Sequence, residues 1–209
     1  IGNDGNIVVT GTIQGETLFS DGNILNSNSE EIVMFVAKID SENGNILWNE
    51  QLISSYTDTI NSKFLVLDDS NNIIVSGEDN CNCINQRNVL FFKLDYSNGN
   101  ILVSDKVLES GVNSSESLSG VQDLELGSNG DIIITGGFYG SIDVDLDLNT
   151  QNILGSSGEQ NYPQLYFAKY DSDFNLVFGL TIYASGNSAS GSDITYDSIN
   201  DLIYLSGIV

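Results

Sequence analysis

Short β-branched runs, each introduced by a turn signal and closed by a glycine, recur along the chain. Four copies are present, at residues 3–11, 70–77, 128–136 and 198–207. A run rich in Ile, Val and Thr between Asn, Asp and Gly residues predicts a β-strand. The closing glycines are spaced by 66, 59 and 71 residues, at Gly11, Gly77, Gly136 and Gly207. The chain is therefore predicted to be an array of similar units, one every ~60 to 70 residues.

Three further kinds of segment recur around each run, and each is predicted to be a strand. One kind carries a lysine and ends in aspartate, at residues 35–40, 91–95 and 167–171. A turn and another apolar segment follow it, at residues 43–48, 98–103 and 173–178. Asn-Gly opens the first two of these and is a strong hairpin signal. The last kind precedes the run, at residues 64–67, 121–126 and 193–196. No segment has the 3.6-residue period of an amphipathic helix.

The spacing between the preceding strand and the run aligns the units. Three strand ends stand six residues before the first apolar residue of the run; the pairs are Leu67 and Ile73, Leu126 and Ile132, and Tyr196 and Leu202. Ile1 stands six residues before Ile7 in the same way. We therefore expect Leu202 to occupy the position in its unit that Ile73 and Ile132 occupy in theirs.

Each complete unit is expected to hold four short antiparallel strands, and the chain supplies three, four, four and two of them. Tandem four-stranded units are the blades of a β-propeller. The predicted fold is all-β, a partial propeller whose blade pieces lie at residues 1–55, 56–112, 113–187 and 188–209. Two complete blades are thus flanked by two incomplete ones. Since closure takes about 4 to 8 blades, we expect a single segment of a larger propeller, with no internal domain boundary.

Charge narrows the range of partners. The 29 Asp and Glu residues against 6 Lys and Arg give a formal net charge of −23 at pH 7. Such a chain repels nucleic-acid phosphates and anionic lipid headgroups, and it has no apolar run of the ~18 residues that span a membrane. We expect neither nucleic-acid binding nor membrane insertion. An acidic surface suits a protein exposed to salt or calcium outside the cell, and equally one that needs charge only for solubility.

Cys81 and Cys83 are the two cysteines, and the chain contains no histidine. Two thiols without histidine are too few for a closed zinc site. The lack of histidine also excludes Ser-His-Asp and Cys-His catalytic arrangements. The cysteines either form a tight disulfide in an oxidising compartment or stay as free thiols in a loop. They lie between Gly77 and Lys93, in a connection that is shorter than the equivalent connections of the first and third units. This shorter connection lacks the hairpin that is expected in the two longer ones.

A repeat supplies its own control, because residues that recur belong to the scaffold and residues that occur once are candidates for function. Three lysines occupy one equivalent position and are predicted to pair with blade carboxylates or to lie over a strand face: Lys38, Lys93 and Lys169. Three aspartates close the same strands and are predicted to open turns by bonding their own backbone: Asp40, Asp95 and Asp171.

One acidic segment, residues 143–149, occurs once. Asp143, Asp145 and Asp147 alternate with apolar residues, which predicts a half-buried strand with three carboxylates on one face. Carboxylate oxygens are the ligands that calcium prefers. These three aspartates are therefore candidate calcium ligands, and the alternative is a solvated strand face.

Residues 5–11, 35–40 and 44–48 resemble the repeat of the bacterial seven-bladed β-propeller family of secreted and cell-surface proteins. Residues 137–145 are similar to the loop strand of the Bacteroidetes-type versions. The resemblance implies a location outside the bacterial cell or on its surface. Residues 40–48 also resemble the quinoprotein repeat, although Trp48 becomes Val103 and Phe178 in later copies.

These observations favour an extracellular propeller scaffold that acts as a binding or interaction module. Its partners would be a protein or glycan ligand and the remaining blades of the same propeller. No catalytic constellation and no cofactor other than calcium is indicated. The alternatives are a carbohydrate-active or quinoprotein-type propeller enzyme, whose active site lies partly in other blades, and a structural repeat module of a surface adhesin.

Overall fold

The protein is all-β in the part that the structure describes. The computed structural model describes residues 1–19, 22, 24–26, 32–53, 60–79, 88–110, 120–147, 149–155, 162–184 and 188–208. Over these residues the only helical element is a 3-10 turn, Ser128–Gly130. No helix in this part has the length and apolar character that would carry it across a membrane.

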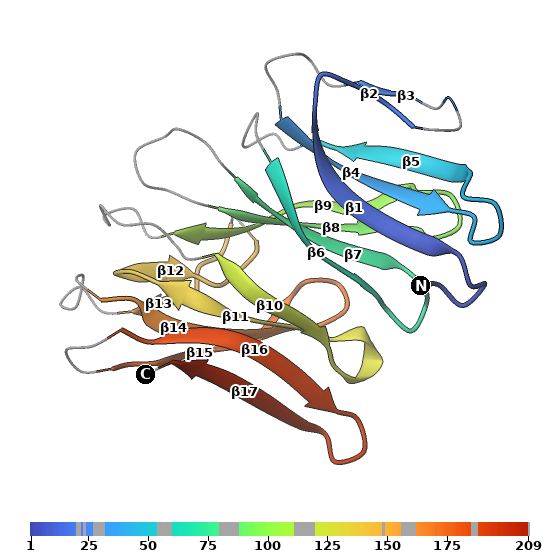
Figure 1. Cartoon of the computed structure of the whole chain (residues 1–209). Coiled ribbons are helices and arrows are strands. Elements are labelled where there is room, and N and C mark those ends of the chain that lie inside the picture. The colour runs from blue at the N-terminus through green and yellow to red at the C-terminus, as the bar shows by residue number, and fades with distance from the viewer. Residues whose placement is uncertain are drawn as a thin grey trace. The chain divides into compact units, whose positions relative to one another are not determined.

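Four of the sheets follow the same rule: strands that are consecutive along the chain lie side by side, apart from the inserted hairpins (Figure 1). The first sheet has the order β1 (Ile7–Gln14), β4 (Ile32–Ile39), β5 (Ile46–Leu52). The third has the order β10 (Val121–Leu126), β11 (Ile132–Phe138), β14 (Gln164–Tyr170), β15 (Leu176–Ile182). All neighbouring strands in these two sheets are antiparallel.

The second sheet has six strands: β6 (Ile60–Leu67), β7 (Ile73–Asp79), β8 (Val89–Leu94) and β9 (Ile101–Ser110) follow one another, and β12 (Ser141–Asp143) and β13 (Ile153–Gly155) extend it beyond β9. The fourth consists of β16 (Ser190–Asp197) and β17 (Leu202–Ile208). The repeat-like arrangement of strands expected from the sequence is therefore present. The two long connections hold the hairpins β2 (Glu16–Leu18) with β3 (Ile24–Asn26), and β12 (Ser141–Asp143) with β13 (Ile153–Gly155).

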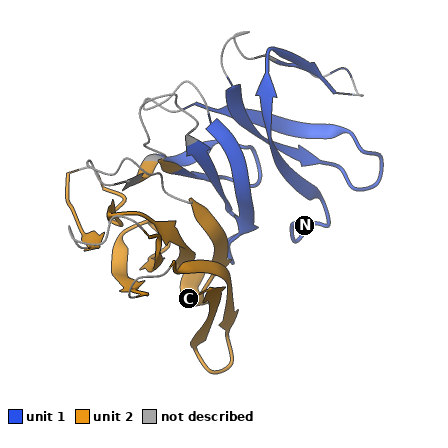
Figure 2. Cartoon of the chain, turned by 60° about the vertical axis from the view of Figure 1, so that its left-hand side comes forward, with its two compact units in different colours: residues 1–81, 90–105 blue, residues 82–89, 106–209 orange. Residues whose placement is uncertain are grey.

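The chain divides into two compact units, shown in different colours in Figure 2. The first comprises residues 1–81 and 90–105, and so holds the first sheet and most of the second. The second comprises residues 82–89 and 106–209. It holds the third and fourth sheets, and in it the last residues of β9 pair with β12.

Within each compact unit, apolar residues fill the space between neighbouring layers. In the second unit one cluster joins the third sheet to the fourth and includes Ile133, Leu165, Phe167 and Ile194. Ile203 and Leu205 of β17 pack against it. In the first unit a smaller cluster places the β2–β3 hairpin on the first sheet through Ile13, Leu25 and Val33. This burial orders the inserted hairpin.

The recurring glycine that closes each run has a steric reason. Each of Gly77, Gly136 and Gly207 lies opposite the start of a register shift in the preceding strand, which is a β-bulge. A Cβ at Gly207 would lie 2.5 Å from the backbone oxygen of Ser190, and a Cβ at Gly136 would collide with the backbone oxygen of Gly120. At Gly11 it would lie 2.6 Å from the ring of Phe35. Only glycine fits the backbone contacts at Gly136 and Gly207, whereas a side chain at Gly11 would require the Phe35 ring to move.

The register of the fourth sheet corrects the alignment expected from spacing. Leu67 pairs with Ile73 and Leu126 pairs with Ile132, but Tyr196 pairs with Ile203. The fourth turn is therefore one residue longer, and Ile203 takes the place predicted for Leu202. Burial agrees, because Leu202 is exposed and Ile203 packs against the core cluster.

Candidate functional site

The recurring lysines form ion pairs, as predicted. Lys38 Nζ lies 2.9 Å from Asp4 Oδ2, and Lys169 Nζ lies 2.7 Å from Asp131 Oδ2. Lys93 Nζ lies 3.1 Å from Asp68 Oδ2, and both of these side chains are at most 10% exposed. Each pair joins a lysine-bearing strand (β4, β8 or β14) to the turn that precedes the strand paired with it (β1, β7 or β11). These lysines belong to the scaffold.

The carboxylate of the pair comes from a different position of the turn in each sheet. Asp4, Asp68 and Asp131 precede the first paired residues of β1, β7 and β11 by three, five and one positions. Since the lysine position is fixed and the aspartate position is not, the geometry of the pair is maintained without a fixed sequence spacing. This explains why sequence comparison found the lysines and missed their partners.

The predicted aspartate turns are also present. The backbone N–H of Glu42, Ser97 and Asp173 donates to Oδ1 of Asp40, Asp95 and Asp171, at 2.8, 2.7 and 2.9 Å. In the first two turns a glycine follows with positive φ, Gly44 at 78° and Gly99 at 77°. In the third turn Phe174 has φ 65° instead.

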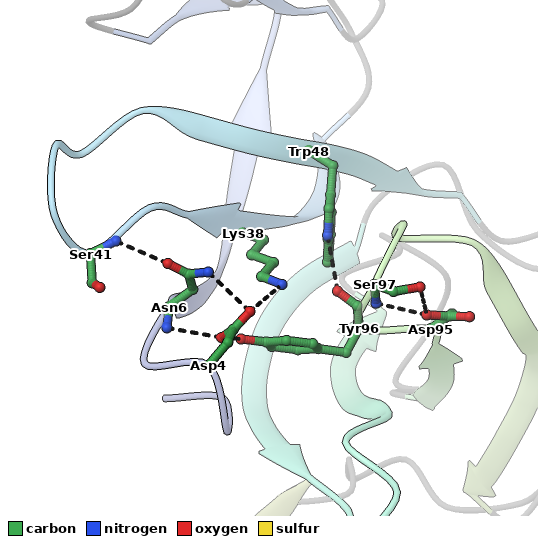
Figure 3. A network of polar contacts seen from close by, with 8 residues as sticks. All are labelled: Asp4, Asn6, Lys38, Ser41, Trp48, Asp95, Tyr96 and Ser97. Atoms are coloured by element: carbon green, nitrogen blue, oxygen red, sulfur yellow. Dashed lines mark hydrogen bonds and ion pairs between the residues drawn. The ribbon is translucent and has the colours of Figure 1, made fainter.

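A polar network in the first compact unit surrounds Asp4 (Figure 3). Asp4 accepts hydrogen bonds from the Tyr96 hydroxyl and from Asn6, and it pairs with Lys38. The Lys38 ammonium lies 3.7 Å from the centroid of the Tyr96 ring, a cation–π contact. Trp48 Nε1 donates to the backbone oxygen of Tyr96 at 3.0 Å. The first sheet and the β8–β9 turn are thus held together.

The pKa shifts in this network favour an ionised Asp4 and a protonated Tyr96, which stabilise the contact between them. The hydrogen bond from Tyr96 and the Lys38 ammonium hold the pKa of Asp4 well below its usual range. Burial, together with the hydrogen bond to Asp4, raises the pKa of Tyr96 to about 12. Tyr96 therefore stays protonated at neutral pH and donates to an ionised carboxylate. Sequence reasoning missed Tyr96, although it replaces Ser41 and Ser172 of the other copies, and that uniqueness was the available signal.

The acidic segment is a series of turns, which corrects the extended strand expected from its alternation. Strand β12 ends at Asp143. After it, three backbone N–H groups donate to the aspartate Oδ1 two residues earlier, each at 3.0 Å: Asp145 to Asp143, Asp147 to Asp145, and Asn149 to Asp147. Aspartate favours such local bonds over strand pairing. The alternation predicted the burial pattern but not the backbone path.

Buried anchors hold this segment in place. Val144 and Leu146 are almost fully buried, and the hydroxyl of the buried Tyr170 donates to the Val144 oxygen at 2.9 Å. Asp143 Oδ1 also accepts the N–H of Asn152 at 2.8 Å, which closes the loop. Asp147 remains exposed and Asp145 is partly exposed. The segment therefore presents carboxylates on a fixed backbone.

The surroundings of Asp147 favour its ionised form. Backbone and side-chain hydrogen bonds from Asn149 lower the pKa of Asp147, and the nearby Lys106 adds to this effect. Thr150 Oγ1 donates to Asp145 Oδ2 at 2.8 Å. Over the described residues, no three acidic or thiol side chains come together in a way that would hold a metal ion. Cys81 and Cys83 lie outside the described residues.

The chain matches no protein-family model and no curated protein.

Proposed function

We propose that the chain is part of a β-propeller that acts as a binding scaffold at the bacterial cell surface. The observation that carries this proposal is the repeated strand order, with the same lysine–carboxylate pair in three successive sheets. Four-stranded antiparallel repeats are the building blocks of propellers. The resemblance of residues 5–11 and 35–40 to a surface-protein repeat supports the location, and the net charge of −23 is compatible with it.

The proposed ligand-binding element is the acidic segment, residues 143–149, together with residues 150–152 that follow it. It interrupts the repeat, and buried groups anchor its backbone. The exposed carboxylate of Asp147 accepts a hydrogen bond from Asn149 Nδ2, and that of Asp145 accepts one from Thr150 Oγ1. Loops on a rigid β scaffold commonly carry binding function. A protein or glycan with hydroxyl or cationic groups would suit this segment.

An array of glycans and bacterial surface proteins, probed with the labelled chain, tests this proposal. We expect saturable binding that is lost in the Asp145→Asn/Asp147→Asn variant and kept in Asp173→Asn, which removes a charge from an exposed turn elsewhere. Absence of any saturable ligand would contradict the binding role. Turnover of a bound glycan would favour the carbohydrate-active alternative, and binding that ignores the acidic segment would place the site elsewhere.

Calcium binding by Asp143, Asp145 and Asp147 stays a separate prediction. Its test is a calcium titration followed by thermal unfolding. A rise in Tm that Asp145→Ala removes would support the ion, and an unchanged Tm would remove it from the account.

A further inference from the structure

The chain contains the dipeptide Asn-Gly three times, and each copy is chemically able to lose its side-chain amide. The copies are Asn43-Gly44, Asn98-Gly99 and Asn129-Gly130. Asparagine is a thermolabile residue, and a following glycine has no side chain to shield its own backbone nitrogen from the asparagine side chain. Because the dipeptide is the same in all three places, the fold decides which copy reacts.

The reaction is deamidation through a cyclic succinimide. The backbone nitrogen of the glycine attacks Cγ of the asparagine, and the N–Cγ bond forms while the Cγ–Nδ2 bond breaks. The amide proton of the glycine leaves with the side-chain amide group as ammonia. One water molecule then opens the succinimide at either carbonyl, which gives aspartate or isoaspartate. No oxidant, reductant or cofactor takes part, but the peptide plane before the glycine must turn out of its folded position.

The local hydrogen bonds of the β4–β5 and β8–β9 turns are alike. In each turn the asparagine Oδ1 accepts the backbone N–H two residues later, and the glycine N–H donates to the backbone oxygen of the aspartate that opens the turn. Both distances are 2.9 Å around Asn43-Gly44 and 2.8 Å around Asn98-Gly99. The φ angles of Gly44 and Gly99 are 78° and 77°. Local bonding therefore does not distinguish the two copies.

The surroundings of the two glycines do distinguish them. Gly44 is exposed, and a Cβ placed on it would meet none of the described residues within 4 Å. Gly99 is buried, and a Cβ on it would lie 2.7 Å from Cε3 of Trp48. The indole is itself fixed, because its Nε1 donates to the backbone oxygen of Tyr96 at 3.0 Å (Figure 3). The peptide plane before Gly44 thus has room to turn, whereas the plane before Gly99 lies under a fixed ring.

The third copy lies in the turn before β11 and is also enclosed. Gly130 is buried, and Asn129 has φ 60° and ψ 19° inside the 3-10 element. The turn is closed by backbone bonds of Asp131, whose N–H donates to the Ser128 oxygen at 3.2 Å and whose oxygen accepts the Gly127 N–H at 2.8 Å. Rotation of the peptide plane before Gly130 would disturb these bonds.

We propose that Asn43 is a site of spontaneous deamidation in the folded protein, and that burial of the following glycine protects Asn98 and Asn129. The reaction weakens the turn in which it occurs. Asn43 Nδ2 donates to Asp40 Oδ2 at 3.1 Å, whereas the carboxylate that replaces the amide has no proton to donate and repels Asp40. The inference is independent of the ligand-binding role above, because it rests on the turns alone.

Incubation of the intact chain at neutral pH, followed by peptide mass spectrometry with isoaspartate detection, measures the three rates in one sample. We expect Asn43 to react at least about tenfold faster than Asn98 and Asn129, because an enclosed site reacts only in the fraction of molecules that is locally open. The same chain in concentrated urea is the control, and there the three rates should be alike. Equal rates in the folded chain, no reaction at Asn43, or a preference for Asn43 that persists in urea would overturn the proposal.

Trp48→Phe tests the source of the protection at Asn98. The variant removes the indole N–H and part of the ring over Gly99, so the reaction at Asn98 should become several-fold faster. The rate at Asn129, in the second compact unit, should stay unchanged and reports any general loosening of the fold. An unchanged rate at Asn98, or equal acceleration at Asn98 and Asn129, would overturn the protection assigned to the ring.

Hydrogen exchange follows the consequence for the turn. Exchange at residues 40–46 should quicken in the incubated chain and stay unchanged in an incubated Asn43→Gln variant, whose longer side chain closes the ring far more slowly. Unchanged exchange in a chain that has deamidated at Asn43 would overturn the claim that the reaction weakens the turn.

Discussion

At the scale of single residues, the contact between Tyr96 and Asp4 is the least expected feature of the chain. The two residues are 92 positions apart, and the hydroxyl, the carboxylate and the Lys38 ammonium satisfy one another. Because Tyr96 is almost fully buried, its hydroxyl has no ready replacement partner. The contact therefore fixes the β8–β9 turn against the first sheet.

Replacing Tyr96 by phenylalanine should destabilise the protein by about 1 kcal/mol, because one hydrogen bond is lost while the ring is kept. Urea unfolding measures the change. Tyr183→Phe serves as the control, since Tyr183 is half exposed, and it should be neutral. Equal stability of Tyr96→Phe and the parent chain would show that the bond contributes nothing.

The same contact predicts a pH dependence at both extremes. The folded-state pKa of Tyr96 is raised to about 12, so its contribution is complete below the unfolded pKa of about 10 and is lost as pH rises towards 12. The folded-state pKa of Asp4 is lowered, so its contribution is present above the unfolded pKa of about 4 and is lost in acid. The stability difference between the parent chain and Tyr96→Phe should therefore shrink above pH 10 and below pH 4. A difference that stays constant from pH 3 to pH 12 would contradict this origin.

At the scale of elements, the two Asn-Gly turns offer a matched pair of glycines. Gly44 and Gly99 occupy equivalent turns with φ near 78°, yet their surroundings differ. A Cβ at Gly44 meets nothing within 4 Å, whereas a Cβ at Gly99 would lie 2.7 Å from Cε3 of Trp48. The second turn is therefore shaped by packing as well as by backbone conformation.

Gly44→Ala should cost about 1 kcal/mol, from the left-handed backbone alone. Gly99→Ala should cost about 1 to 3 kcal/mol more, because it also overpacks against Trp48. Chemical denaturation of both variants gives the difference directly. Adding Trp48→Ala should bring the two costs together; if they already agree with Trp48 present, the ring does not press on the turn.

The acidic segment depends on its buried hydroxyl anchor. Tyr170→Phe removes the donor to the Val144 oxygen and should destabilise the second compact unit by about 1 to 3 kcal/mol, because a buried carbonyl is left unpaired. Hydrogen exchange should quicken at residues 143–147 and stay unchanged in the first sheet. Tyr162→Phe, at an exposed ring, is the control, and equal exchange in both variants would mean that the segment is held by its own turns.

Strands were predictable because their apolar runs and turn residues are local signals. Val121–Leu126 was found with its bounds, and the lysine-bearing strands were found in all three sheets. The one-residue error at Leu202 arose because turn length is not fixed by the run that follows it. The acidic segment was misread because an alternating pattern fixes which side chains are buried, and Asx turns can satisfy that pattern as well as a strand. Partners far apart in sequence, such as Trp48 and Tyr96, leave no local signal.

At the scale of the whole molecule, a chain with 6 basic residues against 29 acidic ones uses three of its lysines for one repeated purpose. The pair of Lys93 with Asp68 is the most buried of the three. Burial alone would raise the pKa of Asp68, but hydrogen bonds from Asn72 and the Lys93 ammonium have the larger effect, so the pKa is lowered. A buried pair of this kind is costly to break, because one charge is left uncompensated. Three of the six basic residues thus form ion pairs that connect a strand to a neighbouring turn.

The most direct test of this account is the unfolding free energy of Lys38→Met, Lys93→Met and Lys169→Met, compared with Lys106→Met at a lysine outside the repeat. If the recurring lysines are scaffold, all three variants lose more stability than the control, because Lys106 acts on Asp147 without a direct ion pair among those that the described residues form. Lys93→Met should lose most, about 3 to 5 kcal/mol, because its partner is the most buried. Lys38→Met should lose less, because Asp4 is 44% exposed. Three variants as stable as the parent chain would contradict the claim that the repeated ion pair holds these sheets together.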